Sequence, residues 1–419
     1  MRIGEFAAKY NLTIDTIRHY MDIELLLPEK KGGHYFFGKK EEEDLKEILD
    51  LKELKFTLSE IQRIVIYSRL SQVRTKEDKN YIRNILLDKK NALDEEKLEI
   101  QNALEILKNK INEIDHIDII EKKKEHTEIK MGVPLTFLQN LSCPNCDIPL
   151  ELEDGKITSN MIMEGYFRCN CGYSGNVKNG IYISLDDEDE KKIQKENVDS
   201  KVKPATTLGE YVEGTEASLI NHIYKSIDST IGFIDIDTLD NKIILELGTG
   251  SGFFIRQFLS YVKPNNTYIV TDHDVNRIKL IKSYLEEHAE NGRFVFICAD
   301  LSKLPIKNQT VDYIINYLTS LNYSLKNDQL LDTILISKIK KGGKQIGCSY
   351  YRKYGSKLLK SASSTSVKFF EERAYKNKIK NLELNKIEVK EIGSVIVESK
   401  YEPMIEGNEL YTLVYCGEK

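Results

Sequence analysis

The apolar and polar positions of residues 1–75 predict a small module of short helices and one hairpin. Apolar residues recur at the three- and four-residue spacing of amphipathic helices, and a proline followed by a Gly-Gly pair interrupts that pattern. Thr13 is placed to cap the second helix, and Thr57 with Glu60 has the spacing of a capping box at the fourth. Two helices joined by a tight turn and followed by a hairpin predict a winged helix-turn-helix.

Residues 76–125 contain neither proline nor glycine and predict one long helix. Its apolar side chains recur every seven residues, at Leu86, Leu93, Ile100, Leu107 and Ile114. A seven-residue repeat needs a second helix to bury it, so we expect a coiled-coil arm that dimerises the chain. A single helix packed on its own domain stays open as the alternative, because Lys90 and Lys97 occupy part of the seam.

In residues 205–419, strand-like runs alternate with amphipathic helical segments. The strand candidates are residues 243–247, 267–271, 293–298, 311–316 and 343–349. This alternation predicts a parallel α/β sheet, and residues 392–398 and 411–416 predict a terminal antiparallel pair. The acidic and polar residues 186–204 predict a solvated linker before this domain.

Composition narrows the possible partners and compartment. The chain has 419 residues and a net charge of -5, and residues 1–75 hold 13 Lys or Arg against 13 Asp or Glu. Any contact with nucleic acid must therefore come from a local basic face and not from overall charge. The sequence shows no apolar run long enough for a membrane helix and no secretory signal at its start, so we expect a cytoplasmic protein.

Four of the seven cysteines lie within a short stretch of the chain. Cys143 and Cys146 form a Cys-x-x-Cys pair, and Cys169 and Cys171 form a shorter Cys-x-Cys pair. Two pairs at this separation predict a small zinc ribbon over residues 136–185 with four thiolate ligands. No histidine lies nearby, so we expect a closed, structural site. The short second pair leaves open whether all four sulfurs bind one ion.

Several pieces of the N-terminal module occur in a distinctive order: Thr16-Ile17-Arg18-His19-Tyr20, Leu25-Leu26-Leu27-Pro28, Gly33, Asp44-Leu45 and Phe56-Thr57-Leu58-Ser59-Glu60-Ile61. In this order they resemble the MerR family of transcriptional regulators. The resemblance implies that the second helix enters the major groove of promoter DNA, and that residues 76–125 pair antiparallel in a homodimer. The candidate DNA contacts are Thr16, Arg18, His19, Tyr20, Lys30, Lys31, Tyr35 and Lys39.

The hairpin departs from the family pattern. Gly33-His34-Tyr35 stands where the family usually has Gly-Tyr-Arg, so the arginine that would bind a phosphate is missing. Lys30, Lys31, Lys39 and Lys40 flank the hairpin and could supply the phosphate contacts instead. A helical domain that has lost DNA binding is the alternative.

The strand at residues 243–247 runs into Gly248-Thr249-Gly250-Ser251-Gly252 and then into a helix. Glycines let a ligand approach the backbone, and a helix N-terminus favours anionic groups. Glu246 lies on this strand, while Asp272 and Asp300 follow the next two strands. Together these features resemble the class I S-adenosylmethionine-dependent methyltransferases. A dinucleotide-binding domain is the weaker rival, because the glycine spacing is Gly-x-Gly-x-Gly and not Gly-x-Gly-x-x-Gly.

The second resemblance implies S-adenosylmethionine as the cofactor. It implies that Asp272 accepts hydrogen bonds from the two ribose hydroxyls and that Asp300 faces the adenine amino group. The candidate cofactor-binding residues are Glu246, Gly248, Gly250, Gly252, Asp272 and Asp300. Catalytic residues and the methyl acceptor stay unknown. Four tyrosines either line a substrate pocket or pack at its rim: Tyr317, Tyr323, Tyr350 and Tyr351.

Together these patterns predict a multidomain fold: an all-α winged helix-turn-helix with a long coiled-coil helix, a small zinc ribbon, and an α/β Rossmann-like methyltransferase. The function we expect is a homodimeric, promoter-binding regulator with a working methyltransferase domain. One alternative is a methyltransferase fold that senses a ligand without turnover. The other is an RNA methyltransferase, because the cysteine region through Gly180-Ile181-Tyr182-Ile183 resembles the zinc module of some rRNA guanine methyltransferases.

Overall fold

The computed structural model describes residues 1–116, 130–184, 207–320, 323, 330–353, 370–402 and 405–419. The chain divides into two compact units, Met1–Lys122 and Lys123–Lys419. The end of the predicted arm, residues 117–125, and the predicted linker at 186–204 lie outside the described residues. In the part of the chain that is described, no helix is both long enough and apolar enough to cross a membrane.

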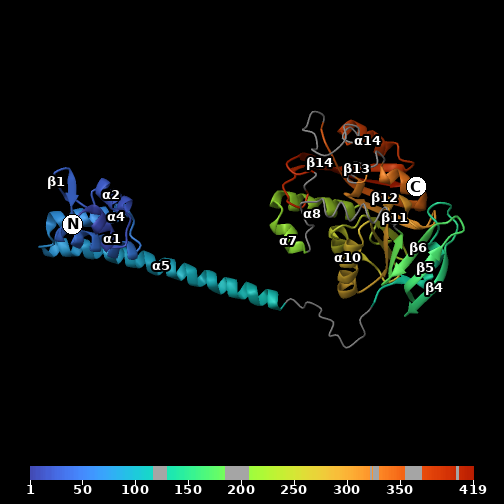
Figure 1. Cartoon of the computed structure of the whole chain (residues 1–419), viewed down its shortest axis with the longest axis horizontal. Coiled ribbons are helices and arrows are strands. Elements are labelled where there is room, and N and C mark those ends of the chain that lie inside the picture. The colour runs from blue at the N-terminus through green and yellow to red at the C-terminus, as the bar shows by residue number, and fades with distance from the viewer. Residues whose placement is uncertain (117–129, 185–206, 321–322, 324–329, 354–369, 403–404) are drawn as a thin grey trace. The chain divides into compact units, whose positions relative to one another are not determined.

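The first unit is a winged helix-turn-helix followed by one long helix (Figure 1). Its elements are α1 (Ile3–Lys9), α2 (Ile14–Asp22), β1 (Glu29–Lys31), β2 (His34–Phe36), α3 (Lys39–Glu53), α4 (Leu58–Ser71) and α5 (Lys76–Asp115). The predicted caps are confirmed: the hydroxyl of Thr13 accepts from the backbone N–H of Thr16 at 3.0 Å, and that of Thr57 accepts from Glu60 at 3.3 Å. Because each cap satisfies an N–H of the first turn, it fixes where α2 or α4 begins.

One apolar cluster holds the winged module together. Phe6, Ile17, Leu45 and Ile61, one from each of α1 to α4, have no exposed surface. Phe37, directly after the hairpin, stacks on Phe6 with the ring centroids 4.4 Å apart. The hairpin is thereby anchored to the helix bundle.

The long helix α5 contacts this cluster along its first part, through Ile82 and Ile85 and through Lys89, whose ammonium group lies 4.8 Å from the ring centroid of Phe56. Further along, Ile100 and Leu107 are 52% and 57% exposed, and no residue of α5 is buried. An apolar seam that stays exposed over several turns has found no partner within the described part of one chain.

The second unit is built on one mixed sheet. Its strands are β3 (Val133–Pro134), β4 (Glu151–Thr158), β5 (Met161–Arg168), β6 (Ser174–Lys178), β7 (Ile181–Ser184), β8 (Ile243–Leu247), β9 (Thr267–Asp272), β10 (Arg293–Ala299), β11 (Val311–Tyr317), β12 (Ile339–Tyr351), β13 (Asn385–Ile396) and β14 (Glu409–Glu418). The order across the sheet is β13-β14-β12-β11-β8-β9-β10-β7-β6-β5-β3, and β4 pairs with β5. The predicted parallel strands are confirmed as β8 to β12. The predicted antiparallel pair is confirmed as β13 and β14, with β14 placed beside β12.

Helices cover this sheet and leave its central strands buried. They are α7 (Leu208–Glu213), α8 (Ala217–Ile231), α9 (Phe253–Phe258), α10 (Val275–His288), α12 (Leu331–Leu335) and α14 (Glu372–Lys380), with short 3-10 turns η1 (Leu135–Asn140), η2 (Leu259–Tyr261), η3 (Leu301–Lys303) and η4 (Ile336–Lys338). The helix α10 packs on β9 and β10, while α8 packs on β12, β13 and β14. Burial on both faces explains why β8 to β10 are nearly continuous apolar runs.

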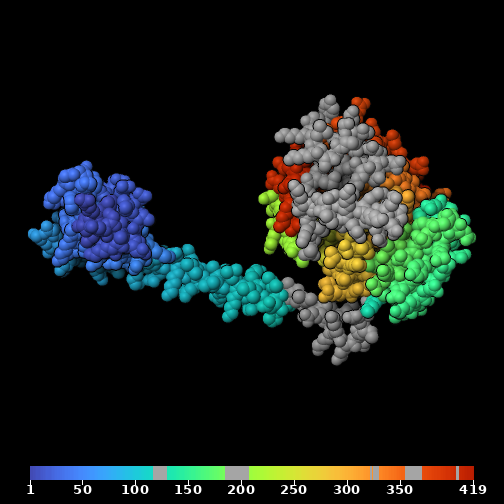
Figure 2. All heavy atoms as spheres, viewed as in Figure 1, coloured from blue at the N-terminus to red at the C-terminus, as the bar shows by residue number. Residues whose placement is uncertain are grey.

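The cysteine module, comprising β3 to β7, shares this sheet. β7 pairs in parallel with β10, so that Ile183 lies opposite Cys298 and Ser184 lies opposite Ala299. In Figure 2 the green residues of the module lie directly against yellow and orange parts of the same unit. Because β7 satisfies the backbone groups along this edge of β10, the two predicted modules form one continuous layer.

Candidate functional site

The Gly-rich turn after β8 is shaped by close contacts around its first and third glycines. Gly248 and Gly252 have φ values of 59° and 75°. A Cβ on Gly248 would lie 2.4 Å from Thr319, and one on Gly252 would lie 2.2 Å from Ile281. Larger residues would therefore displace the turn from its neighbours.

Gly250, in the middle of the turn, differs from its neighbours. Its φ is 57°, yet the nearest heavy atom to an added Cβ would be 3.7 Å away. The space above this glycine is therefore open to a ligand that approaches the backbone.

Asp272, at the end of β9, links that strand to the turn. Its carboxylate accepts from the backbone N–H of Gly250 at 2.9 Å and from that of Asp274 at 3.0 Å. Burial opposes ionisation, but the hydrogen bond from His273, the charge of Arg277 and the Asp274 N–H outweigh it and hold the pKa of Asp272 below its usual value. The site therefore keeps an ionised hydrogen-bond acceptor beside the open face of Gly250.

Glu246, on β8, is buried in a different environment. The hydroxyl of Tyr268 donates to its carboxyl at 2.7 Å. Burial raises the pKa of Glu246 to about 8, and the hydrogen bond from Tyr268 only partly offsets this effect. At neutral pH Glu246 is therefore mainly a neutral group tied to the neighbouring strand.

Asp300 directly follows β10 and starts η3. Its carboxylate accepts from the backbone N–H and the hydroxyl of Ser302, at 2.8 and 2.7 Å. The predicted residues Glu246, Asp272 and Asp300 thus lie along the carboxyl edge of three adjacent strands, β8, β9 and β10. Ligands of open parallel α/β sheets bind outside this edge.

Two residues of this region were not predicted from the sequence. Thr319 donates to the carbonyl of Leu247 at 2.7 Å and so holds the end of β8. Arg277 of α10 approaches the turn, with its Nη1 3.8 Å from an ideal Cβ on Gly250. Neither residue stands in a motif that sequence reasoning could have used.

The tyrosines considered for a substrate pocket pack mainly in the core. Tyr350 and Tyr351 are buried, and Tyr317 is half-buried and packs against the core. The hydroxyl of Tyr317 contacts Ser226 at 2.8 Å and donates to the carbonyl of Ile223 at 3.2 Å. This arrangement favours the packing interpretation for these three residues.

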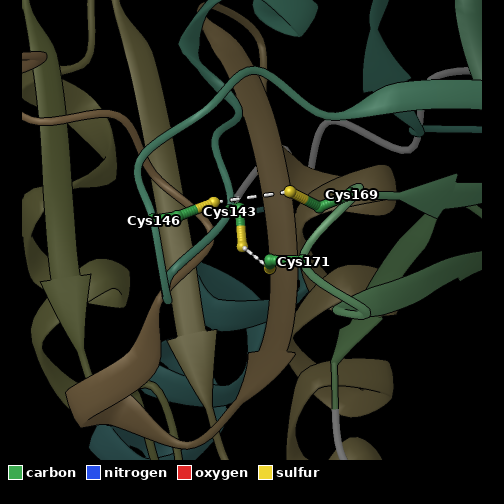
Figure 3. Close-up of side chains that lie close together, drawn as sticks. All are labelled: Cys143, Cys146, Cys169 and Cys171. Atoms are coloured by element: carbon green, nitrogen blue, oxygen red, sulfur yellow. Dashed lines mark hydrogen bonds between the residues drawn. The ribbon is translucent and has the colours of Figure 1, made fainter.

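The four clustered cysteines converge on one point (Figure 3). Their sulfurs all lie within 4.8 Å of one another, with Cys143 and Cys171 3.3 Å apart and Cys146 and Cys169 3.4 Å apart. Sulfurs around a tetrahedral zinc with 2.3 Å bonds are separated by about 3.8 Å, so the donor set fits that metal. The Cys-x-Cys pair therefore brings both of its sulfurs to the same point as the first pair. The backbone N–H of Tyr173, followed by the Cys143 side chain, lowers the pKa of Cys171 to about 7, which favours a thiolate ligand.

The predicted DNA contacts on α2 are largely exposed. The side chain of Arg18 is 65% exposed and lies 3.3 Å from the carboxylate of Asp15. His19 is exposed, whereas Thr16 is half-buried and its hydroxyl contacts that of Thr13 at 2.8 Å. Arg18 and His19 therefore form the accessible part of this helix.

The lysines of the hairpin region are also exposed. The ammonium group of Lys30 lies 5.3 Å from the ring centroid of Tyr35, its partner across β1 and β2. Lys31 pairs with Glu29 at 2.7 Å, and Lys39 lies 3.9 Å from Glu43. Ion pairs at such exposed positions are weak, so these lysines can exchange their partners for phosphates.

The structure corrects the prediction for Tyr20. This residue is 1% exposed and belongs to the apolar cluster, and Lys52 donates to its hydroxyl at 3.1 Å. It lies three residues after Ile17 and therefore on the same buried face of α2. A direct contact of Tyr20 with DNA was a wrong prediction.

Comparison with family models identifies two domains. Residues 1–66 match the MerR HTH family of regulatory proteins, and residues 244–343 match a methyltransferase domain. The chain therefore carries a MerR-type helix-turn-helix domain at its N-terminus and a methyltransferase domain in its second unit. No curated protein matches the chain.

Solved structures give more distant similarities. Phosphoethanolamine N-methyltransferase 2 of Haemonchus contortus, in complex with S-adenosyl-L-methionine, has 12% identity and a TM-score of 0.35 over 46% of this chain and 52% of that one. A SAM-dependent methyltransferase from Aquifex aeolicus has 16% identity and a TM-score of 0.29 over 47% and 96% of the two chains. One from Methanosarcina mazei has 15% identity and a TM-score of 0.33 over 43% and 93%. The chain thus spans about half of the length of the Haemonchus enzyme.

We predict that the purified chain carries about one zinc ion, held by the four converging cysteines. Cys146→Ser should release the ion and loosen the cysteine module, because it removes one of the four sulfurs that meet there. Elemental analysis and limited proteolysis measure both effects. Cys416→Ser, at a buried cysteine on β14, is the matched control and should retain the metal. A wild-type protein that contains no zinc would contradict the prediction.

Proposed function

We propose that the chain is a DNA-binding transcriptional regulator of the MerR type with an S-adenosylmethionine-dependent methyltransferase domain. The observation that carries this proposal is the pairing, in one chain, of an exposed helix-turn-helix face with an ionised carboxylate beside a Gly-rich turn. The four-cysteine site would hold a structural zinc, since its four converging sulfurs would fill all four positions of a tetrahedral ion.

The winged module would bind promoter DNA through α2. Arg18 and His19 project from its exposed face, and an arginine there can contact a guanine edge or a phosphate. Lys30, Lys31 and Lys39 lie on or next to the hairpin, where they would contact the DNA backbone.

The arm would join two chains. Four apolar residues of the seven-residue repeat are exposed, and the last three of them are more than half exposed: Leu86, Ile100, Leu107 and Ile114. A second copy of α5 would cover this seam, and antiparallel pairing would produce a symmetric homodimer. Such a dimer matches the two-fold symmetry of a pseudo-palindromic promoter site.

The edge of β8, β9 and β10 would bind the cofactor. The ionised carboxylate of Asp272 would accept from the ribose hydroxyls, and Asp300 would accept from the adenine amino group. The open face of Gly250 leaves room for the cofactor against the backbone. When bound, S-adenosylmethionine supplies an activated methyl group, and the contribution of the chain is to position it.

For the DNA module, we expect Arg18→Ala to weaken promoter binding by about 1–3 kcal/mol, because it removes a contact to a base or phosphate. Gel shifts with DNA upstream of the gene, at one fixed salt concentration, measure the change. Lys108→Ala, at an exposed site on α5, removes the same charge and should have little effect. Equal affinities for Arg18→Ala and wild type would show that α2 does not enter the groove.

For the arm, we expect Ile100→Glu combined with Leu107→Glu to give monomers, because two charges would have to be buried in the seam. Light scattering reports the mass. Asn102→Glu with Asn109→Glu adds the same charges on the opposite side of α5 and should leave a dimer. A dimer that survives the first pair of changes would rule out this interface.

For the cofactor site, we expect Asp272→Ala to weaken S-adenosylmethionine binding by about two orders of magnitude, since two charge-assisted hydrogen bonds are lost. Gly250→Val should have a similar effect, because its side chain would fill the open space. Calorimetry measures the dissociation constants. Asp237→Ala, at an exposed residue, is the control.

The wild-type protein decides between the remaining functions. No binding of S-adenosylmethionine would reject the cofactor proposal. Binding without methyl transfer to any fraction of a cell extract would favour the sensor that performs no turnover. Methyl transfer to RNA, without promoter binding, would favour the RNA methyltransferase.

A further inference from the structure

The first cysteine pair is built into a ladder with the segment that follows Asp300. The backbone N–H of Lys307 donates to the carbonyl of Asn140 at 2.9 Å, and that of Ser142 donates to the carbonyl of Pro305 at 3.2 Å. Leu141 and Ile306 form an antiparallel bridge between these contacts. Cys143 follows Ser142 in the chain, so the backbone that carries the first cysteine pair is hydrogen-bonded to residues 305–308.

Asp147 extends this ladder on the other side of the pair. Its carboxylate accepts from the hydroxyl of Ser142 at 2.8 Å and from the backbone N–H of Asn308 at 3.3 Å. The loop between the two cysteines is thereby closed onto the same segment. Leu301, Leu304 and Ile306 are buried, which makes the connection from Asp300 to this ladder a packed one.

The second cysteine pair is connected to the strand that precedes Asp300. The backbone N–H of Cys169 donates to the carbonyl of Tyr173 at 3.0 Å, and the hydroxyl of Tyr173 contacts that of Ser184 at 2.5 Å. Ser184 ends β7 and lies opposite Ala299, the residue before Asp300.

We infer that the four-cysteine site positions Asp300, so that metal binding and recognition of the adenine amino group are coupled. One cysteine pair holds the backbone after Asp300, and the other holds the strand opposite the residue before it. A metal bound by both cysteine pairs would fix the position of the backbone after Asp300 relative to β7, the strand opposite Ala299. Asp147 and Tyr173 act as positioning residues in this arrangement. The inference rests on the proposed zinc and cofactor sites.

The test compares the binding of two ligands to the full-length chain, S-adenosylhomocysteine and S-inosylhomocysteine. The second ligand has an oxygen in place of the adenine amino group. Calorimetry is done on the zinc-loaded chain and after zinc removal with a chelator. We expect zinc removal to weaken S-adenosylhomocysteine about tenfold and S-inosylhomocysteine by less than about twofold. Readdition of Zn²⁺ should restore the original affinity for S-adenosylhomocysteine and with it the difference in affinity between the two ligands.

Two positioning variants test the same coupling without removing a sulfur. Asp147 has a φ of 57°, so Asp147→Gly deletes the carboxylate without straining the backbone, whereas Asp147→Asn keeps an acceptor. We expect Asp147→Gly and Tyr173→Phe to retain zinc and to weaken S-adenosylhomocysteine about fivefold, with little change for S-inosylhomocysteine. Asp147→Asn should behave like the wild type.

The outcomes separate this inference from the proposed function. Equal weakening of both ligands, or no weakening of either, would overturn the coupling while leaving cofactor binding intact. A wild-type chain that binds neither ligand would overturn the proposed cofactor site and the coupling with it.

Discussion

The parallel pairing of β8, β9 and β10 is the constraint on which the proposed cofactor site depends. Parallel strands end at the same edge of a sheet, so acidic residues that are far apart in the sequence meet there. Register is decisive: Glu246 lies opposite Val270, and Cys298 lies opposite Asp272. A slip of one residue would turn the Asp272 side chain to the other face. The same carboxylate holds the N–H of Gly250, so register and loop conformation support each other.

Glu246 and Asp272 show how hydrogen-bond partners decide the charge of a buried carboxyl group. Both are almost completely buried, and burial alone raises the pKa of a carboxylic acid. Glu246 receives one hydrogen bond from a neutral hydroxyl, and its pKa stays raised. Asp272 receives backbone N–H groups and lies near His273 and Arg277, and its pKa is lowered. Of these two buried carboxyl groups, the negative charge is thus placed on Asp272, which holds the backbone of the turn.

Local patterns in the sequence were sufficient for most elements of the fold. Helical spacing, caps and apolar runs predicted α2, α4 and β8 to β12, because these signals act within a few residues. The pairing of β7 with β10 had no such signal, since a parallel partner more than a hundred residues away leaves no trace in either strand. The convergence of the cysteines was predicted from spacing, but the closeness of the Cys-x-Cys sulfurs depends on the turn between β5 and β6.

Within the candidate sites, residue types could be predicted from the sequence more reliably than side-chain directions. Tyr20 was misplaced because an aromatic residue suits both a DNA contact and a core, and only its spacing from Ile17 separates the two. Thr319 and Arg277 act through contacts with the turn, which depend on tertiary structure. Asp272 and Asp300 could be predicted because strand ends mark the ligand-binding edge of a parallel sheet.

The neutral charge of the winged module makes the proposed dimerisation through α5 important for the affinity for DNA. The winged module holds equal numbers of basic and acidic residues, so a single module has little long-range attraction for DNA. Joining two modules makes the second contact intramolecular and can raise the overall affinity by about two to four orders of magnitude without any new contact to DNA. A neutral module is therefore more dependent on dimerisation than a strongly basic one. The apolar seam of α5 would supply that dimerisation. Within the described residues nothing in the chain covers the later part of this seam, so a second copy of α5 would have to bury it.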